Sequence, residues 1–72
     1  MNIVWLLKWA DYDECAFPSK EKAIRYVETL YNEHGQKCRV ATSPENRVVF
    51  EYLTGGEWVK SDATIRGIPL YT

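Results

Sequence analysis

The sequence predicts a small α+β domain in which one amphipathic helix packs on an antiparallel β-sheet as a second layer. Three patterns support this prediction: a helical stripe of apolar residues within residues 19–34, strand-like runs before and after it, and a glycine pair between the last two runs. The chain of 72 residues is long enough for one domain, spanning 1–72, and too short for a second. Its three Trp, five Tyr and two Phe residues supply enough apolar area for a small core without disulfides or a metal.

The first predicted strand spans residues 3–9, where most side chains are apolar or β-favouring. Apolar side chains fall on both alternating faces, which is typical of a strand inside a sheet rather than at its edge. One face carries Trp5, Leu7 and Trp9, and the other carries Val4 and Leu6. Residues 10–16 are acidic, and we expect them to form a loop that leads into the helix.

The helix is predicted over residues 19–34. Ser19 is the expected N-cap, because its hydroxyl can accept a hydrogen bond from a backbone N–H that has no partner within the helix. Gly35 is the expected end, since glycine readily adopts the left-handed backbone of a C-terminal cap. The apolar stripe recurs at helical spacing and comprises Ala23, Ile24, Val27, Leu30 and Tyr31.

Three strands are predicted after the helix, over residues 37–42, 47–53 and 57–60. A turn at residues 43–46 separates the first two. Gly55-Gly56 separates the last two and is a good hairpin signal, because both central positions of a tight turn can need positive φ.

The tail after residue 60 is ambiguous. Asp62 could cap one short helical turn ending at Gly67, and residues 68–71 could run along an edge of the sheet. The predicted order is therefore β-α-β-β-β, with a short extra element at the C-terminus. The strand order within the sheet does not follow from the sequence.

The charge balance narrows the classes of function. Nine basic residues stand against ten acidic ones, so the chain is neither a polycation nor a highly charged DNA mimic. No segment reads as a signal peptide or reaches the apolar length of a membrane span. We therefore expect a cytoplasmic protein without a membrane partner, in which Cys15 and Cys38 stay reduced.

We expect no enzyme activity, metal or cofactor. The acidic residues within 11–14 lack the later ligands and the glycine of a calcium-binding loop. Cys15, His34 and Cys38 supply three candidate zinc ligands, whereas a structural zinc site needs four. Neither cysteine stands in a local context that pairs it with His34 as a catalytic base.

Trp58 is the most informative candidate for function. In the register of a two-residue turn, Leu53 faces Trp58 and Glu51 faces Lys60, on the sheet face opposite to Phe50. If the helix covers the Phe50 face, an apolar pair rimmed by charges is left towards solvent, which is typical of a protein-binding hot spot. A three-residue turn would instead move Trp58 into the core.

The first functional hypothesis is a non-enzymatic module that binds a protein partner, or a second copy of itself, through the open face of its sheet. The residues expected to carry it are Trp58, Leu53, Glu51 and Lys60, with Trp5 or Trp9 depending on which face is open. The alternative is a single-stranded nucleic-acid-binding module that uses nearby rings and the basic residues Lys37, Arg39 and Arg47.

Residues 3–31 resemble a pattern common in small bacteriophage and prophage proteins, in which a short strand ending in Trp, an acidic loop and a capped helix follow one another. The pattern is carried by Trp9 to Asp13 and then by Phe17, Ser19, Lys22, Ala23, Tyr26, Val27 and Leu30. The resemblance implies an origin on a mobile element and an accessory role, in which the protein binds and modulates a host or phage protein. It transfers no functional residues.

Overall fold

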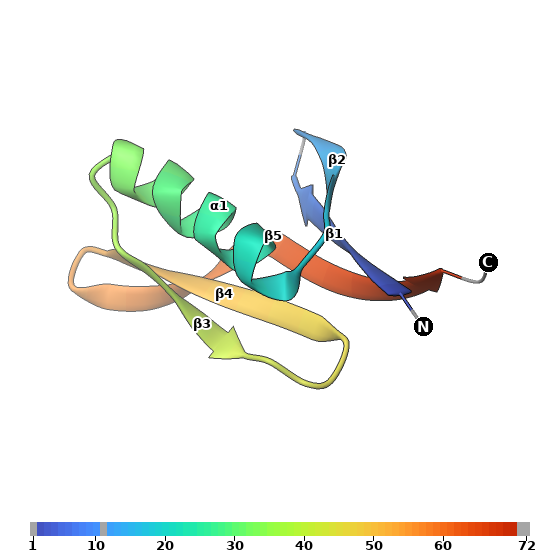
Figure 1. Ribbon diagram of the computed structural model, residues 1–72. Coiled ribbons are helices and arrows are strands. Elements are labelled where there is room, and N and C mark those ends of the chain that lie inside the picture. Colours follow the sequence, from blue (N-terminus) through green and yellow to red (C-terminus); the bar gives the residue numbers. More distant parts are fainter. Residues whose placement is uncertain (1, 11, 71–72) are drawn as a thin grey trace.

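A long C-terminal strand lies at the centre of the sheet. The computed structural model describes residues 2–10 and 12–70. Its five strands pair antiparallel in the order β2-β1-β5-β4-β3, and one helix packs on the sheet (Figure 1). The elements in chain order are β1 (Asn2–Trp9), β2 (Tyr12–Phe17), α1 (Lys20–Glu33), β3 (Cys38–Thr42), β4 (Arg47–Thr54) and β5 (Glu57–Leu70). The predicted α+β class with a helix on an antiparallel sheet is confirmed.

The predicted acidic loop is wrong, because most of it forms the strand β2. This strand pairs with β1 so that Trp5 lies opposite Phe17 and Leu7 lies opposite Cys15. Charged residues are compatible with β2 because it is an edge strand, where one side of the backbone meets water. The order before the helix is therefore β-β-α rather than the predicted β-α.

The predicted helical turn in the tail is also wrong, because residues 57–70 form one continuous strand. Gly67, the expected end of that turn, lies opposite Trp5 on β1. A Cβ atom at Gly67 would lie 2.8 Å from Cζ3 of Trp5, so the glycine makes room for the indole ring. The tail runs through the middle of the sheet and not along its edge as predicted. Tyr71, the last residue of the predicted edge segment, lies outside the described residues.

Pro69 is compatible with this strand because of where its missing N–H would point. The N–H of Gly67 donates to the carbonyl of Asn46, on the β4 side of β5. Alternate residues of a strand direct their N–H groups to the same side, so Pro69 faces that side too. Strand β4 begins at Arg47, opposite Arg66, and does not reach Pro69, so no hydrogen bond of the sheet is lost.

The helix is confirmed almost residue for residue. The Ser19 hydroxyl accepts a hydrogen bond from the backbone N–H of Lys22 at 3.2 Å. Gly35 follows the helix with φ of 72°, as its predicted role requires. From the predicted stripe, Ala23, Val27 and Tyr31 are buried against the sheet.

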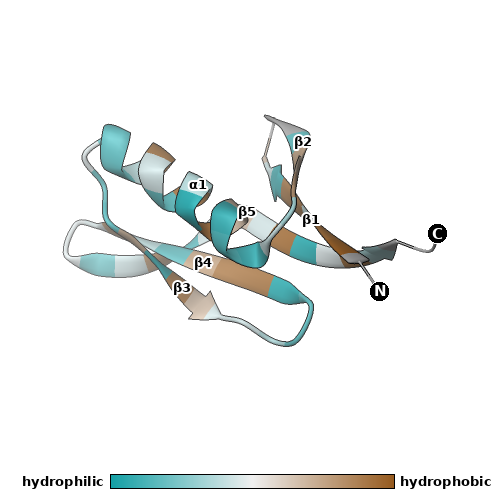
Figure 2. Ribbon diagram, in the orientation of Figure 1, coloured by the Kyte–Doolittle hydropathy of each residue, from teal (hydrophilic) through white to brown (hydrophobic). Residues whose placement is uncertain are grey.

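The core lies between α1 and one face of the sheet. It contains Leu7 from β1, Val48 and Phe50 from β4, and Ala63 and Ile65 from β5, together with the buried helix residues. Figure 2 shows a hydrophobic stretch of β4 where the strand passes beneath the helix. Burial of these side chains supplies the main favourable free energy of folding.

One hydrogen bond ties the helix to the central strand within this core. The Tyr31 hydroxyl lies 2.6 Å from Oγ of Ser61, which also accepts a hydrogen bond from the backbone N–H of Ala63 at 3.0 Å. Ser61 is 2% exposed, so these partners satisfy a polar group that would otherwise destabilise the core.

Candidate functional site

Within residues 2–10 and 12–70, no helix lies on the second face of the sheet, and we call this face the open face (Figure 1). Its residues follow from the alternation along each strand, starting from the buried residues of the other face. They are Val4, Leu6 and Lys8 of β1, Arg47, Val49, Glu51 and Leu53 of β4, and Trp58, Lys60, Asp62, Thr64, Arg66 and Ile68 of β5. Arg39 of β3, which lies opposite Glu51, joins them.

The Gly55-Gly56 hairpin has the predicted two-residue turn, with φ of 58° and 78° at the two glycines. Leu53 lies opposite Trp58 and Glu51 lies opposite Lys60, as predicted. Because the helix packs on the Phe50 face, this register places Trp58 and Leu53 on the open face. The alternative with Trp58 in the core is therefore wrong.

Trp58, Arg39, Glu51 and Leu53 form a cluster near the hairpin, which we call the Trp58 cluster. The Arg39 guanidinium carbon lies 4.0 Å from the centroid of the Trp58 ring. Arg39 also donates two hydrogen bonds to Oε1 of Glu51, from Nε at 3.0 Å and from Nη2 at 2.9 Å. The guanidinium is thus held by a carboxylate while it stacks on an indole, a geometry that arginine provides and lysine does not.

The Trp58 cluster restricts the indole without burying it. Trp58 is 36% exposed, and the Arg39 side chain in the ion pair is 51% exposed. An exposed ion pair contributes little to stability, on the order of 1 kcal/mol or less. The stacking and the ion pair favour one orientation of the Trp58 ring, which would lower the entropy lost in any binding at this ring.

The structure brings most of the predicted site residues onto one face. Lys60 lies opposite Glu51 and is exposed. Arg39, predicted for nucleic-acid binding, lies in the Trp58 cluster. Arg47 lies on the same face at the far end of β4, and the exposed Lys37 precedes β3, with its carbonyl accepting from the N–H of Leu53.

The predicted contribution of Trp5 or Trp9 to the open face is wrong. Both tryptophans lie on the helix side and pack against the core. The Trp9 ring lies 5.0 Å from that of Tyr31, and Nζ of Lys20 lies 5.8 Å from the centroid of Trp5. The alternation along β1 gives the open face Val4 and Leu6 instead.

Arg66 is a charged open-face residue that the sequence analysis did not single out. It lies opposite Arg47 on β4 and opposite Leu6 on β1. Its alternation with the buried Ile65 is visible in the sequence, but it becomes informative only when residues 61–70 are recognised as a strand.

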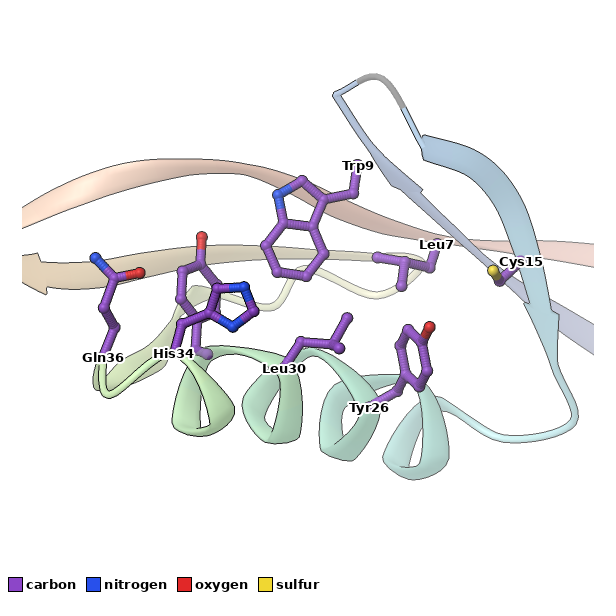
Figure 3. Close-up of a pocket in the computed structure, with 8 residues that line it drawn as sticks. Leu7, Trp9, Cys15, Tyr26, Leu30, His34 and Gln36 are labelled. Atoms are coloured by element: carbon purple, nitrogen blue, oxygen red, sulfur yellow. The ribbon is translucent and has the colours of Figure 1, made fainter.

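A separate pocket of about 510 Å³ lies between α1 and the β1–β2 hairpin (Figure 3). Its lining is mainly apolar and aromatic and comprises Leu7, Trp9, Cys15, Tyr26, Leu30, Tyr31, His34 and Gln36. Cys15 and His34 lie at opposite ends of this pocket in Figure 3, so the thiol and the imidazole do not meet as nucleophile and base.

Cys38 lies on β3, at the opposite edge of the sheet from Cys15, so the two cysteines cannot form a disulfide with each other. Burial, and to a smaller degree the Glu28 carboxylate, raise the pKa of the Cys38 thiol from 9.0 to about 11. Its thiol therefore stays protonated at neutral pH, in contrast to a catalytic cysteine.

The chain matches no family model, no curated protein and no solved structure. Within residues 2–10 and 12–70, no group of three or more His, Cys, Asp or Glu side chains is placed to hold a metal ion. In the same part of the chain, no helix has the length and apolar character needed to cross a membrane.

Proposed function

We propose that the protein is a small, non-enzymatic module that binds another protein through the open face, with the Trp58 cluster as its anchor. The observation that carries this proposal is the exposure of Trp58 on the helix-free face, where Arg39 holds the ring in place. Partly exposed Trp and Arg side chains beside an aliphatic neighbour are the composition of binding hot spots. A cytoplasmic accessory protein of phage type, acting on a host or phage protein, belongs to the same proposal.

The Trp58 cluster favours a protein partner over single-stranded nucleic acid. A nucleic-acid module stacks bases on exposed ring faces and contacts phosphates with unpaired basic groups. Arg39 occupies one face of the Trp58 ring, and its charge is balanced by Glu51. The ring and the cation that the alternative would use are therefore already engaged with each other.

A second copy of the chain is another occupant that the proposal admits. Light scattering over a range of protein concentrations, at low and high salt, separates the two cases. A dimer that persists at high salt and is lost in Trp58→Ala would assign the open face to self-association. A monomer at all concentrations would leave the face to a different protein.

Affinity capture from candidate host lysates tests the role of Trp58 directly. Tyr26→Ala is the matched control, because Tyr26 is 42% exposed on the helix and Trp58 is 36% exposed on the sheet. We expect Trp58→Ala to reduce captured protein at least tenfold, as for a hot-spot residue, and to leave the unfolding midpoint nearly unchanged. Equal losses in the two variants, or unfolding of Trp58→Ala, would contradict the proposal.

A further inference from the structure

Arg47 and Arg66 lie directly opposite each other on β4 and β5, at the end of the open face that is remote from the Trp58 cluster. Both side chains are exposed. Like charges at opposite positions of an antiparallel pair destabilise the pairing. An anion that binds both guanidinium groups would remove this repulsion, so the folded chain gains stability when such a group is bound.

Within the part of the chain that the structure describes, neither Arg47 nor Arg66 forms an ion pair. Among the side chains that the structure describes, the ion pair of Arg39 with Glu51 is the only one. Glu45 lies in the turn just before Arg47 but forms no ion pair with either arginine, and Glu14 and Asp62 lie where the pairing of β2 and of β5 is irregular. The two exposed guanidinium groups therefore remain available to a carboxylate that approaches this end of the sheet.

Aliphatic side chains surround the arginine pair. Leu6 lies opposite Arg66, Val4 lies opposite Ile68, and Val49 is the next open-face residue of β4 after Arg47. All four of these apolar side chains are partly buried. A ligand that binds here would contact two guanidinium groups and the aliphatic side chains around them.

This combination fits a protein better than a nucleic acid. The Trp58 cluster, which holds the aromatic ring of the open face, is separated from Arg47 by the length of β4 between Arg47 and Leu53. That length is about 20 Å at roughly 3.3 Å per residue. No ring is therefore available at the arginine pair for a base to stack on, within residues 2–10 and 12–70.

We propose that Arg47 and Arg66 bind carboxylate groups of an acidic, apolar segment of the protein partner. The proposal rests on the proposed function and adds the chemistry of the partner. A guanidinium group can take a carboxylate in a bidentate geometry, and aliphatic residues of the same segment would cover Leu6 and Val49. A second copy of the open face is a poor match, because it would bring a second arginine pair into the same interface.

The test uses the full chain and two capped peptides, one in which Glu alternates with Val and one in which Gln alternates with Val. A single-stranded oligothymidylate of about 12 nucleotides is the third probe. The variant Arg47→Gln/Arg66→Gln removes the pair. The matched control, Lys22→Gln/Arg25→Gln, removes two exposed positive charges from the helix and gives the same net charge.

We expect the Glu peptide to bind the natural protein at low salt at least about tenfold more tightly than the Gln peptide. We also expect Arg47→Gln/Arg66→Gln, but not the control, to lose this difference. In NMR titrations the side-chain Nε–Hε signals of Arg47 and Arg66 should shift, whereas that of Arg39 should not. The unfolding midpoint of the natural protein should rise with added Glu peptide.

Three results would overturn the inference. They are equal loss of binding in the two charge variants, tighter binding of the oligothymidylate than of the Glu peptide, and no binding of the Glu peptide at low salt. Capture experiments with Trp58→Ala distinguish a failure of this inference from a failure of the proposed function. If capture of a partner depends on Trp58 and not on the arginine pair, the inference alone fails.

Discussion

The two faces of the sheet differ in how their polar groups are satisfied. On the face beneath α1, the buried hydroxyl of Ser61 is satisfied by Tyr31 and by a backbone N–H. On the open face, Arg39 is balanced by Glu51, but Arg47 and Arg66 oppose each other. The buried polar group of the covered face thus has its hydrogen-bond partners within the chain. On the open face, Arg47 and Arg66 lie beside apolar side chains and form no ion pair among the described residues. The difference is consistent with folding constraining the covered face and with the binding role that we propose for the open face.

The largest expected contrast is between Phe50 and Leu53, which lie on opposite faces of β4. Phe50 is completely buried, so Phe50→Ala should lower the free energy of unfolding by about 3–5 kcal/mol. Leu53→Ala should lower it by about 1 kcal/mol or less, because Leu53 lies on the open face. Urea denaturation measures both.

Phe50→Ala can leave so small a domain unfolded, so Phe50→Leu is the second variant. It keeps an apolar side chain in the core and should cost about 1–2 kcal/mol. If Leu53→Ala destabilises as much as Phe50→Ala, the open face contributes to stability like the core, and the contrast is lost.

A smaller expected effect is the loss of stability at alkaline pH. It comes from the covered face, because the two groups with a raised pKa, Tyr31 and Cys38, lie there. Burial raises the pKa of the Tyr31 hydroxyl, an effect that its hydrogen bond with Ser61 opposes, and the pKa of Cys38 rises to about 11. Between pH 9 and 11 the unfolded chain releases the Cys38 proton and the folded chain holds it. The free energy of unfolding should therefore fall as pH rises through this window.

Cys38→Ala removes the thiol contribution and should flatten this part of the stability curve, measured by denaturation at a series of pH values. Alkylation followed by mass spectrometry gives an independent check. At pH 8 the exposed Cys15 should react well before Cys38, whose thiol is about one part in a thousand ionised at a pKa of about 11. Equal rates would contradict the assigned burial of Cys38.

The smallest expected effect on stability is at Arg39. Arg39→Gln removes the ion pair with Glu51 and the stacking on Trp58, and should change the free energy of unfolding by about 1 kcal/mol or less. The indole should nevertheless become more mobile. Side-chain relaxation of the Trp58 Nε1–H group in NMR would show this, with Trp9 on the covered face as the unchanged control.

The parts of the fold that the sequence predicted are those set by local chemistry. Ser19, Gly35 and the Gly55-Gly56 pair act through their own backbone, so the helix bounds and the hairpin register followed without knowledge of the sheet. The Trp58 cluster could be predicted in part for the same reason. Two strands next to a known turn have a known register, and that register placed Leu53, Glu51 and Lys60 around Trp58.

The failures involve partners that are distant in the sequence. Residues 12–17 have an acidic, loop-like composition, and only pairing with β1 makes them a strand. Gly67 and Pro69 disfavour a strand locally. In the sheet, however, Trp5 fills the space above the glycine, and the first residue of β4, Arg47, pairs with Arg66, so β4 does not extend as far as Pro69. The pair of Arg47 and Arg66 was missed because its two members come from strands whose register at that end depends on the whole of β5.

The irregular pairing within β5 has a consequence for the spacing of the two ends of the open face. Between the pairs Thr64–Val49 and Lys60–Glu51, β5 advances four residues while β4 advances two. The two extra residues of β5 are an even number, so they do not change which side chains face the core. Trp58 and Arg66 therefore point to the same side of the sheet. An insertion or deletion of one residue here would exchange the inward and outward side chains on one side of it. Either Trp58 or Arg66 would then face the core. We therefore expect chains that share this binding mode to differ in length at this point only by even numbers.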